Sequence, residues 1–367
     1  MNLAVNPVRT LVVFLAILSF SSFAIAQDEV GNWDKAVSLY KQSQYRESIV
    51  EFRKVINEIP THSESWKFMG LAYFQVKEYD LAAEALTKAY DLKKADGRTD
   101  NDILSALSRC YIGSNKFEKA LPRLEALVKQ QPEAANNFYL LGVAYANLQR
   151  PSDAVIALKN AVKLDPHDMD SWYYMAALQL KNKMTDDAIV SLKGAVAASP
   201  KNVEMITLLT ETQLRKAVAE TDPARSNLAF EEAIKSANKL KSVRDDGASA
   251  ELLGRIYLAA KRYTSAELTL SRALTLTKEP TANLYFNLGL AHAQNKSYAR
   301  AAEMLLQADR LGPGNVDTLN YLGFVYENLR KFQMALDAYS RAFELSGRSN
   351  QEIKEAIDRV TPFAHPQ

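Results

Sequence analysis

A 34-residue repeat constrains this chain more than any other feature of its sequence. Pro132, Pro166 and Pro200 follow one another at intervals of 34 residues, and the same interval separates Gly289 from Gly323. A period of this length indicates stacked supersecondary units, because one such unit cannot bury its own apolar face. We therefore expect the units to bury a continuous core along the chain.

Each unit repeats one apolar pattern. In the clearest copy, Phe138-x-x-Leu141-Gly142-x-x-Tyr145 is followed by Ala154, Leu158, Ala161 and Pro166, and further copies begin at Trp66, Trp172, Tyr285 and Leu319. The large residues lie three or four positions apart, so they share one face of a first helix. The glycine and the alanines let a second, antiparallel helix approach closely. The proline ends that second helix, because it cannot donate the next backbone hydrogen bond.

This pattern resembles the tetratricopeptide repeat, whose period and W-x-x-L-G-x-x-Y…A-x-x-x-F…P motif it shares. The resemblance covers nearly all of residues 29–349 and implies an all-α superhelix (solenoid) of about nine helix pairs. We place the repeats at 29–62, 63–96, 101–134, 135–168, 169–202, 203–246, 247–280, 282–315 and 316–349. Residues 27–349 would then form the array, and residues 350–367 a capping helix and a tail.

Three departures from regular spacing predict irregular segments. The step between the second and third repeats is 38 residues, which predicts an added loop in Lys93–Asp102. From Thr210 to Gly254 the step is 44, which predicts an insertion in residues 216–227 of the enlarged sixth repeat, 203–246. We expect its second helix to run from about Ala229 to Leu240. The capping helix should cover Gln351–Val360, with Asn350 at its start and Thr361-Pro362 as its stop.

The first 26 residues have the three parts of a secretory signal peptide. Arg9 is their one charge, Leu11 to Phe23 is mostly apolar, and Ala24-Ile25-Ala26 is a small-x-small cleavage site. We expect cleavage after Ala26 and export, in a bacterium to the periplasm. The alternative is an uncleaved anchor that tethers the protein to the inner membrane.

The charged and reactive side chains favour neither nucleic acid nor catalysis. The chain has 45 basic and 43 acidic residues, so it has no excess charge to attract nucleic acid. Its one cysteine, Cys110, excludes an intramolecular disulfide and is expected to be a buried small apolar residue. No two of its four histidines have metal-ligand spacing, and His292 is expected in the core. We interpret the aspartates of residues 96–102 and 165–170 as turn residues and helix N-caps. We expect no active site, metal or cofactor.

The resemblance also implies where a partner binds. In this family the first helices line a concave groove, with positions 2, 5, 9 and 12 of each repeat pointing inward. Carried onto this chain, these positions give the candidate site residues Lys67, Phe74, Arg109, Asn136, Tyr139, Asp170, Tyr173, Arg255, Asn283, Phe286, Asn320 and Phe324. The alternative for the aromatic residues is packing between neighbouring first helices. Lys67 is followed at position 9 by Leu71, so the Lys–Asn clamp with which some members hold a C-terminal carboxylate is absent.

Together these features predict an exported, non-enzymatic scaffold that binds a protein or peptide segment in its groove and helps assemble or position cell-envelope components. One alternative is a membrane-tethered assembly factor that holds an enzyme complex on its convex face. A role in polysaccharide export rests on analogy alone. The sequence leaves the identity of the partner and the oligomeric state open.

Overall fold

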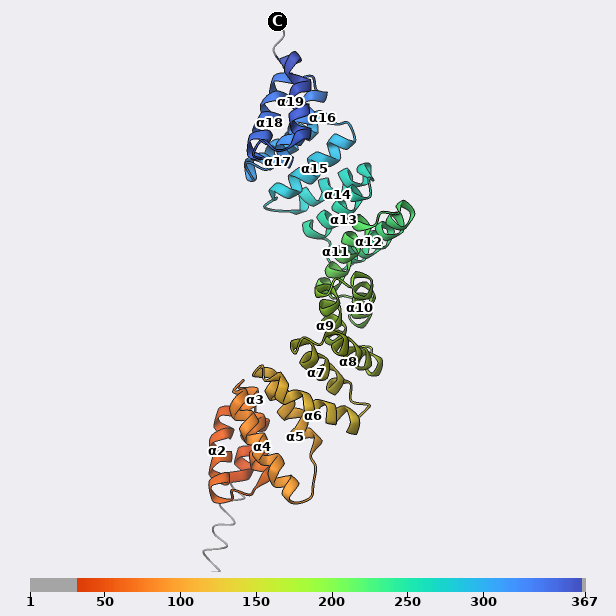
Figure 1. Ribbon diagram of the computed structural model, residues 1–367. Helices are drawn as coiled ribbons and strands as arrows, with labels where there is room; N and C mark the ends of the chain where they lie inside the picture. The colour runs from red at the N-terminus through yellow and green to blue at the C-terminus, as the bar shows by residue number, and fades with distance from the viewer. Residues whose placement is uncertain (1–31, 365–367) are drawn as a thin grey trace, which may run out of the picture. The chain divides into compact units, whose positions relative to one another are not determined.

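The computed structural model describes residues 32–364, in which all regular secondary structure is helical (Figure 1). The predicted signal segment, residues 1–26, lies outside the described residues. The chain divides within α9 into an N-terminal body, up to Leu178, and a C-terminal body, from Gln179. The predicted all-α solenoid of helix pairs with a capping helix is confirmed.

The N-terminal body begins with a helix over residues 32–41. It continues with α2 Tyr45–Glu58, α3 Ser63–Gln75, α4 Tyr79–Ala95, α5 Asn101–Gly113, α6 Phe117–Gln130, α7 Ala135–Asn147, α8 Pro151–Leu164 and most of α9 Met169–Lys181. Paired helices of this body pack on each other, as α3 does on α4 and α7 on α8, and a second helix also packs on the first helix of the next repeat, as α4 does on α5.

The C-terminal body continues the same scheme. It contains α10 Thr185–Ala198, α11 Val203–Ala219, α12 Pro223–Val243, α13 Gly247–Ala259, α14 Tyr263–Leu276, α15 Ala282–Gln294, α16 Tyr298–Leu311, α17 Val316–Asn328, α18 Phe332–Leu345 and α19 Gln351–Ala364. The last helix, α19, packs on α18 and buries Ile353, Ala356 and Val360.

The small residue of the repeat pattern sets how closely paired helices approach. A Cβ atom added to Gly142 of α7 would lie 2.6 Å from Cγ of Leu158 on α8. This is far inside van der Waals contact, so the two helices could not keep this distance with a larger residue there. The close approach predicted from the sequence is confirmed at this pair.

Eight of the turns that join paired helices share one conformation. Each has three residues, and the middle one has a positive φ: Ser43, Lys77, Asn115, Gln149, Lys183, Lys261, Lys296 and Arg330. In the fourth repeat the N–H of the next residue, Arg150, donates to the carbonyl oxygen of Tyr145 at 2.9 Å. Such a bond satisfies a carbonyl at the end of the first helix. The second helix then begins without a side-chain cap.

The sixth repeat differs, and our expectation for it was wrong. Instead of a loop in residues 216–227, both helices are longer: α11 has 17 residues and α12 has 21, against 13 and 14 for α7 and α8. The helix α12 begins at Pro223, before the expected Ala229. Oδ1 of Asp222 accepts a hydrogen bond from the N–H of Arg225 at 2.8 Å. Asp222-Pro223 is therefore a helix cap followed by a first-turn proline, and not the middle of a loop.

Two smaller expectations also need correction. The helix α4 continues to Ala95, so part of the segment expected to be a loop lengthens this helix. Thr361-Pro362 does not stop α19, which runs to Ala364. The ring of Phe363 in the last turn packs on Phe332 with ring centroids 5.1 Å apart, which holds that turn in place. The predicted start is confirmed, because Oδ1 of Asn350 accepts from the N–H of Ile353 at 3.2 Å.

Candidate binding surface

The first helices of seven of the nine repeats carry the predicted site residues, and we call these twelve residues the helix-A surface. They differ in exposure. The exposed members are Arg109, Asn136, Asp170 and Tyr173 in the N-terminal body, and Arg255, Asn283 and Phe324 in the C-terminal body. The half-buried members are Lys67, Phe74, Tyr139, Phe286 and Asn320. Exposure separates the side chains that could meet a partner from those that also serve the fold.

Several aromatic side chains pack between successive first helices. The ring at position 5 of one repeat meets the ring at position 6 of the next, edge to face. The pairs are Trp33 with Phe68 at 5.7 Å between centroids, Tyr139 with Tyr174 at 6.2 Å, and Phe286 with Tyr321 at 5.8 Å. Such pairs contribute about 0.5–1.5 kcal/mol beyond the area they bury. Tyr139 and Phe286 therefore stabilise the stack, as the alternative interpretation of the sequence held.

Phe74 is also held in place by its neighbours. The guanidinium of Arg109 lies over its ring, 4.6 Å from the centroid, and the ring of Tyr79 lies 5.5 Å away. Phe74 is half-buried and Arg109 is exposed. The guanidinium of Arg109 therefore covers one face of the ring while the arginine itself stays accessible to water. The structure thus brings together two predicted site residues from neighbouring repeats.

Lys67 belongs to an ion-pair cluster. Its ammonium lies 3.0 Å from Oδ2 of Asp100, which also binds Lys93 at 2.8 Å. Oδ1 of Asp100 accepts from the N–H of Ile103 at 3.0 Å and so caps α5, as the turn-and-cap interpretation expected. Burial disfavours the charged carboxylate of Asp100, but the hydrogen bonds from Lys93, Ile103 and Lys67 outweigh it and lower its pKa to about 2. Lys67 therefore serves the fold at this position.

Tyr139 and Asp170 lie close together at the boundary of the fourth and fifth repeats. Burial raises the pKa of the Tyr139 hydroxyl, and the carboxylate of Asp170 raises that pKa further. Asp170 and its neighbour Tyr173, one helical turn on, are both exposed, and 37% of Tyr173 is accessible. The exposed predicted residues of the N-terminal body thus combine a carboxylate, a phenol, the amide of Asn136 and the guanidinium of Arg109.

In the C-terminal body Glu327, one turn after Phe324 on α17, is bonded within the protein itself. Arg359 of α19 donates from Nε to Oε1 of Glu327 at 2.7 Å, and the Tyr339 hydroxyl donates to its other oxygen at 3.1 Å. These bonds from Arg359 and Tyr339 lower the pKa of Glu327 despite its burial. Phe324 is 38% exposed, with its ring 6.2 Å from that of Tyr298. Asn320 is half-buried, and Arg255 and Asn283 are exposed.

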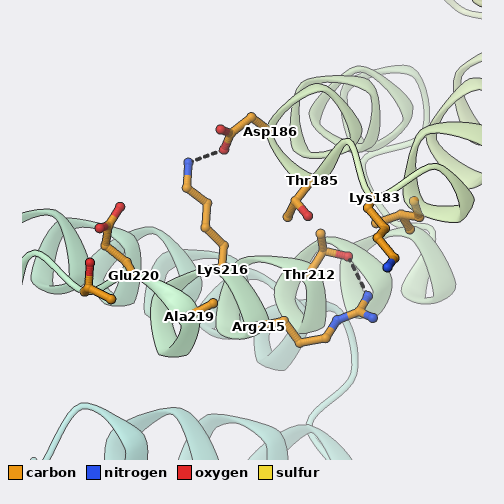
Figure 2. Close-up of a pocket in the computed structure, with 10 residues that line it drawn as sticks. Lys183, Thr185, Asp186, Thr212, Arg215, Lys216, Ala219 and Glu220 are labelled. Carbon is orange, nitrogen blue, oxygen red and sulfur yellow. Dashed lines mark hydrogen bonds and ion pairs between the residues drawn. The ribbon is translucent and has the colours of Figure 1, made fainter.

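A depression that the sequence did not predict lies beside the sixth repeat. It has a volume of about 500 Å³ and is formed by the turn after α9, the start of α10 and the extended end of α11 (Figure 2). Its polar lining includes Lys183, Thr185, Thr212, Arg215 and Lys216. The 44-residue step from Thr210 to Gly254 could have indicated this depression, if the extra residues had been interpreted as a longer α11 instead of a loop.

Among the described residues, the cysteine and His292 are buried, and His62 caps a helix. Cys110 is fully buried, and burial raises the pKa of its thiol to about 12. His292 is 6% exposed in the core, as predicted, and burial lowers its pKa although Glu267 opposes this. His62 accepts the N–H of Ser65 at the start of α3. Residues 32–364 contain no group of three or more side chains able to hold a metal ion.

Comparison with known proteins decides the family. The sequence model described as "Tetratricopeptide repeat" matches residues 106–168, 139–203, 212–279 and 275–316, and a second model of the same description matches residues 63–96. The matches to the first model cover more than half of the chain. The chain belongs to the tetratricopeptide repeat family. Tetratricopeptide repeat proteins are typically non-enzymatic scaffolds that bind protein or peptide partners.

Curated relatives match this tetratricopeptide repeat protein over short segments. The heat shock protein STI1 of Saccharomyces cerevisiae is 34% identical over 87 residues, which are 23% of this chain and 14% of the relative. The uncharacterized protein ycf37 of Guillardia theta is 31% identical over 105 residues, 28% of this chain and 59% of the relative. The chain therefore spans less than two thirds of these relatives.

Two solved structures match about half of this chain. MamA residues 41 to the end, from Desulfovibrio magneticus RS-1, shares 18% identity, with 47% of this chain and 96% of that chain covered and a TM-score of 0.45. YrrB, titled a TPR protein with an unusual peptide-binding site, shares 15% identity, with 56% of this chain and 99% of that chain covered and a TM-score of 0.44.

Within residues 32–364, no helix has both the length and the apolar character needed to cross a membrane.

Proposed function

We propose that this tetratricopeptide repeat protein is an exported scaffold that holds a protein or peptide segment on its helix-A surface. In this role it would assemble or position components of a bacterial cell envelope. The family supports the binding of protein segments, and the signal-like residues 1–26 support export. The scaffold itself would carry out no chemistry.

The observation that carries the proposal is the exposure of Asp170 and Tyr173, one turn apart on α9, and of Asn136 at the position of α7 equivalent to Asp170. An exposed tyrosine next to hydrogen-bonding groups is typical of binding surfaces, because its rigid ring offers a large contact area at low entropic cost. Tyr139 is a weaker choice, since its removal would also break the contact with Tyr174.

A photo-crosslinking experiment tests the proposal. A photoreactive amino acid is placed at Tyr173 in the native host, and at Lys159 as the control, an exposed position on the second helix α8 of the same body. We expect a defined crosslinked partner from position 173 and none of that partner from position 159. The partner should then bind Tyr173→Ala about 30-fold more weakly, the effect of losing about 2 kcal/mol at a hot spot. Crosslinking from position 159 alone would overturn the proposal.

Export is tested separately by the N-terminus of the mature protein. We expect a protein that begins at Gln27 in the periplasmic fraction. Retention of residues 1–26 on membrane-bound protein would contradict cleavage and favour the tethered assembly factor. Because the crosslinking result does not depend on cleavage, either half of the proposal can fail alone.

A further inference from the structure

The extension of the sixth repeat creates a polar depression in the C-terminal body. The turn between paired helices normally ends the first helix after 13 residues, as in α7, but α11 has 17. The added turn contains Lys216 and Ala219, and both line the depression together with Glu220 and Thr221 just beyond it. A repeat of regular length would lack this wall.

Two cations in the depression have no carboxylate partner. Lys183 follows α9 and Arg215 lies on α11, and among the described residues no acidic oxygen lies within 4.0 Å of either side chain. Arg215 donates to Oγ1 of the fully buried Thr212 at 3.4 Å. In Figure 2 both cationic groups lie at the same end of the depression. Both side chains are exposed, and an anion that joins them would offset their mutual repulsion.

The remaining charges of the depression are accounted for. Lys216 forms an ion pair with Asp186 of α10, so these two charges offset each other (Figure 2). The one other carboxylate in the lining, Glu220, lies at the opposite end in the same view. Among the lining residues drawn in Figure 2, the other polar groups next to Lys183 and Arg215 are the hydroxyls of Thr185 and Thr212. The end that holds the two cations therefore carries a local positive charge.

We propose that Lys183 and Arg215 bind an acidic side chain, aspartate or glutamate, of a protein segment that the scaffold holds on its C-terminal body. The guanidinium can donate two parallel hydrogen bonds to one carboxylate, and the lysine ammonium a third. The volume of about 500 Å³ exceeds the size of one carboxylate, so neighbouring residues of the segment can enter as well. This assignment rests on the proposed scaffold function and names the chemistry of its ligand.

A peptide pair tests the chemistry directly on the full chain. The probe is an acetylated and amidated peptide with four glutamates, and its partner has four glutamines. We expect the glutamate peptide to bind and its affinity to fall as salt is added, while the glutamine peptide binds at least about tenfold more weakly. Equal binding of the two peptides, or binding of neither, would overturn the proposal.

Two double variants with the same change in net charge locate the site. Lys183→Gln with Arg215→Gln should weaken binding of the glutamate peptide about tenfold or more. Lys201→Gln with Lys278→Gln alters two exposed lysines in turns of the same body and should leave the affinity within about twofold. An equal loss in both double variants would show a diffuse charge effect and refute the assignment.

Thermal unfolding separates binding from a structural role. Because Lys183 and Arg215 make no ion pair with any residue that the structure describes, their replacement by glutamine should leave the melting temperature unchanged or raise it slightly. A clear fall in melting temperature would mean that these side chains support the fold, and would overturn the proposal. If binding of the peptide pair fails while Tyr173 still crosslinks a partner, only this inference is lost and the scaffold function stands.

Discussion

The fourth and sixth repeats reach dense packing in opposite ways. In the fourth, Gly142 of α7 leaves room for Leu158 of α8. In the sixth, the residue equivalent to the glycine is Thr210 and the residue equivalent to the leucine is Ala237, and both are fully buried. A larger residue on the first helix is balanced by a smaller one on the second. We infer that the volumes of the two residues are matched in these two repeats, and that glycine itself is not required.

The two repeats also differ in how the chain turns between helices. In the fourth, Gln149 has φ of 58° and α8 begins without a side-chain cap. In the sixth, the turn has no residue with positive φ, and Asp222 caps α12. Longer helices thus coincide with a different turn chemistry. The comparison shows that this fold tolerates an insertion when the new residues extend both helices and the turn supplies its own cap.

The largest effect is expected from Gly142→Trp. Even a Cβ atom at this position would lie 2.6 Å from Leu158, so an indole would force α8 away from α7. Overpacking commonly costs about 1–3 kcal/mol, and this change should reach or exceed the upper end. Urea unfolding of the full chain measures the loss. Lys159→Trp, which places the same ring on the exposed face of α8, is the control and should unfold almost as the natural protein does.

The volume rule is tested by Ala237→Leu in the sixth repeat. With Thr210 opposite, the leucine should overpack the contact and cost about 1–3 kcal/mol in the free energy of unfolding. Adding Thr210→Gly recreates the glycine–leucine combination of the fourth repeat and should restore part of that loss. A double-mutant cycle measures this coupling. Additive losses from the two changes would show that the helices are not matched by volume at this position.

Most of the fold could be predicted because the repeat pattern is local. The spacing of Gly142, Ala154 and Leu158 describes one helix pair completely, and the 34-residue period then places the others. The sixth repeat could not be predicted by spacing. Asp222-Pro223 is as typical of a turn as of a helix start, and the choice depends on whether the flanking residues are helical. In the structure they are helical, since α11 runs to Ala219 and α12 begins at Pro223.

The candidate site was less predictable than the fold, since a groove position does not decide what a side chain contacts. The packing role of Tyr139 could have been recognised, because Trp33, Tyr139 and Phe286 are each followed by an aromatic residue 35 positions later. The role of Lys67 could not, because its partner Asp100 lies in the irregular step between two repeats. Whether the exposed residues bind a partner stays a prediction.

A smaller effect is expected from removing the cap of the sixth repeat. Asp222→Ala deletes the acceptor for the N–H of Arg225. It should lower the free energy of unfolding by about 1 kcal/mol, a typical value for a lost N-cap.

 

The matched control is Lys331→Ala. Lys331 precedes α18 in the same body, is exposed, and makes no side-chain cap. Chemical denaturation of the two variants should therefore show a loss of about 1 kcal/mol for Asp222→Ala and almost none for Lys331→Ala. Similar losses in both would mean that the sixth turn does not depend on its cap, and the contrast between the two kinds of turn would fail.

The smallest effect is expected from placing glycine in the two turns. Gln149 is exposed and holds a positive φ, which costs a residue with a side chain about 1 kcal/mol or more, so Gln149→Gly should stabilise the protein by a few tenths to about 1 kcal/mol. Thr221, the middle residue of the sixth turn, has no positive φ. Thr221→Gly gives the unfolded chain more freedom without relieving strain, so it should destabilise slightly. Urea midpoints that shift in opposite directions would support two distinct turns, whereas shifts of the same sign would contradict them.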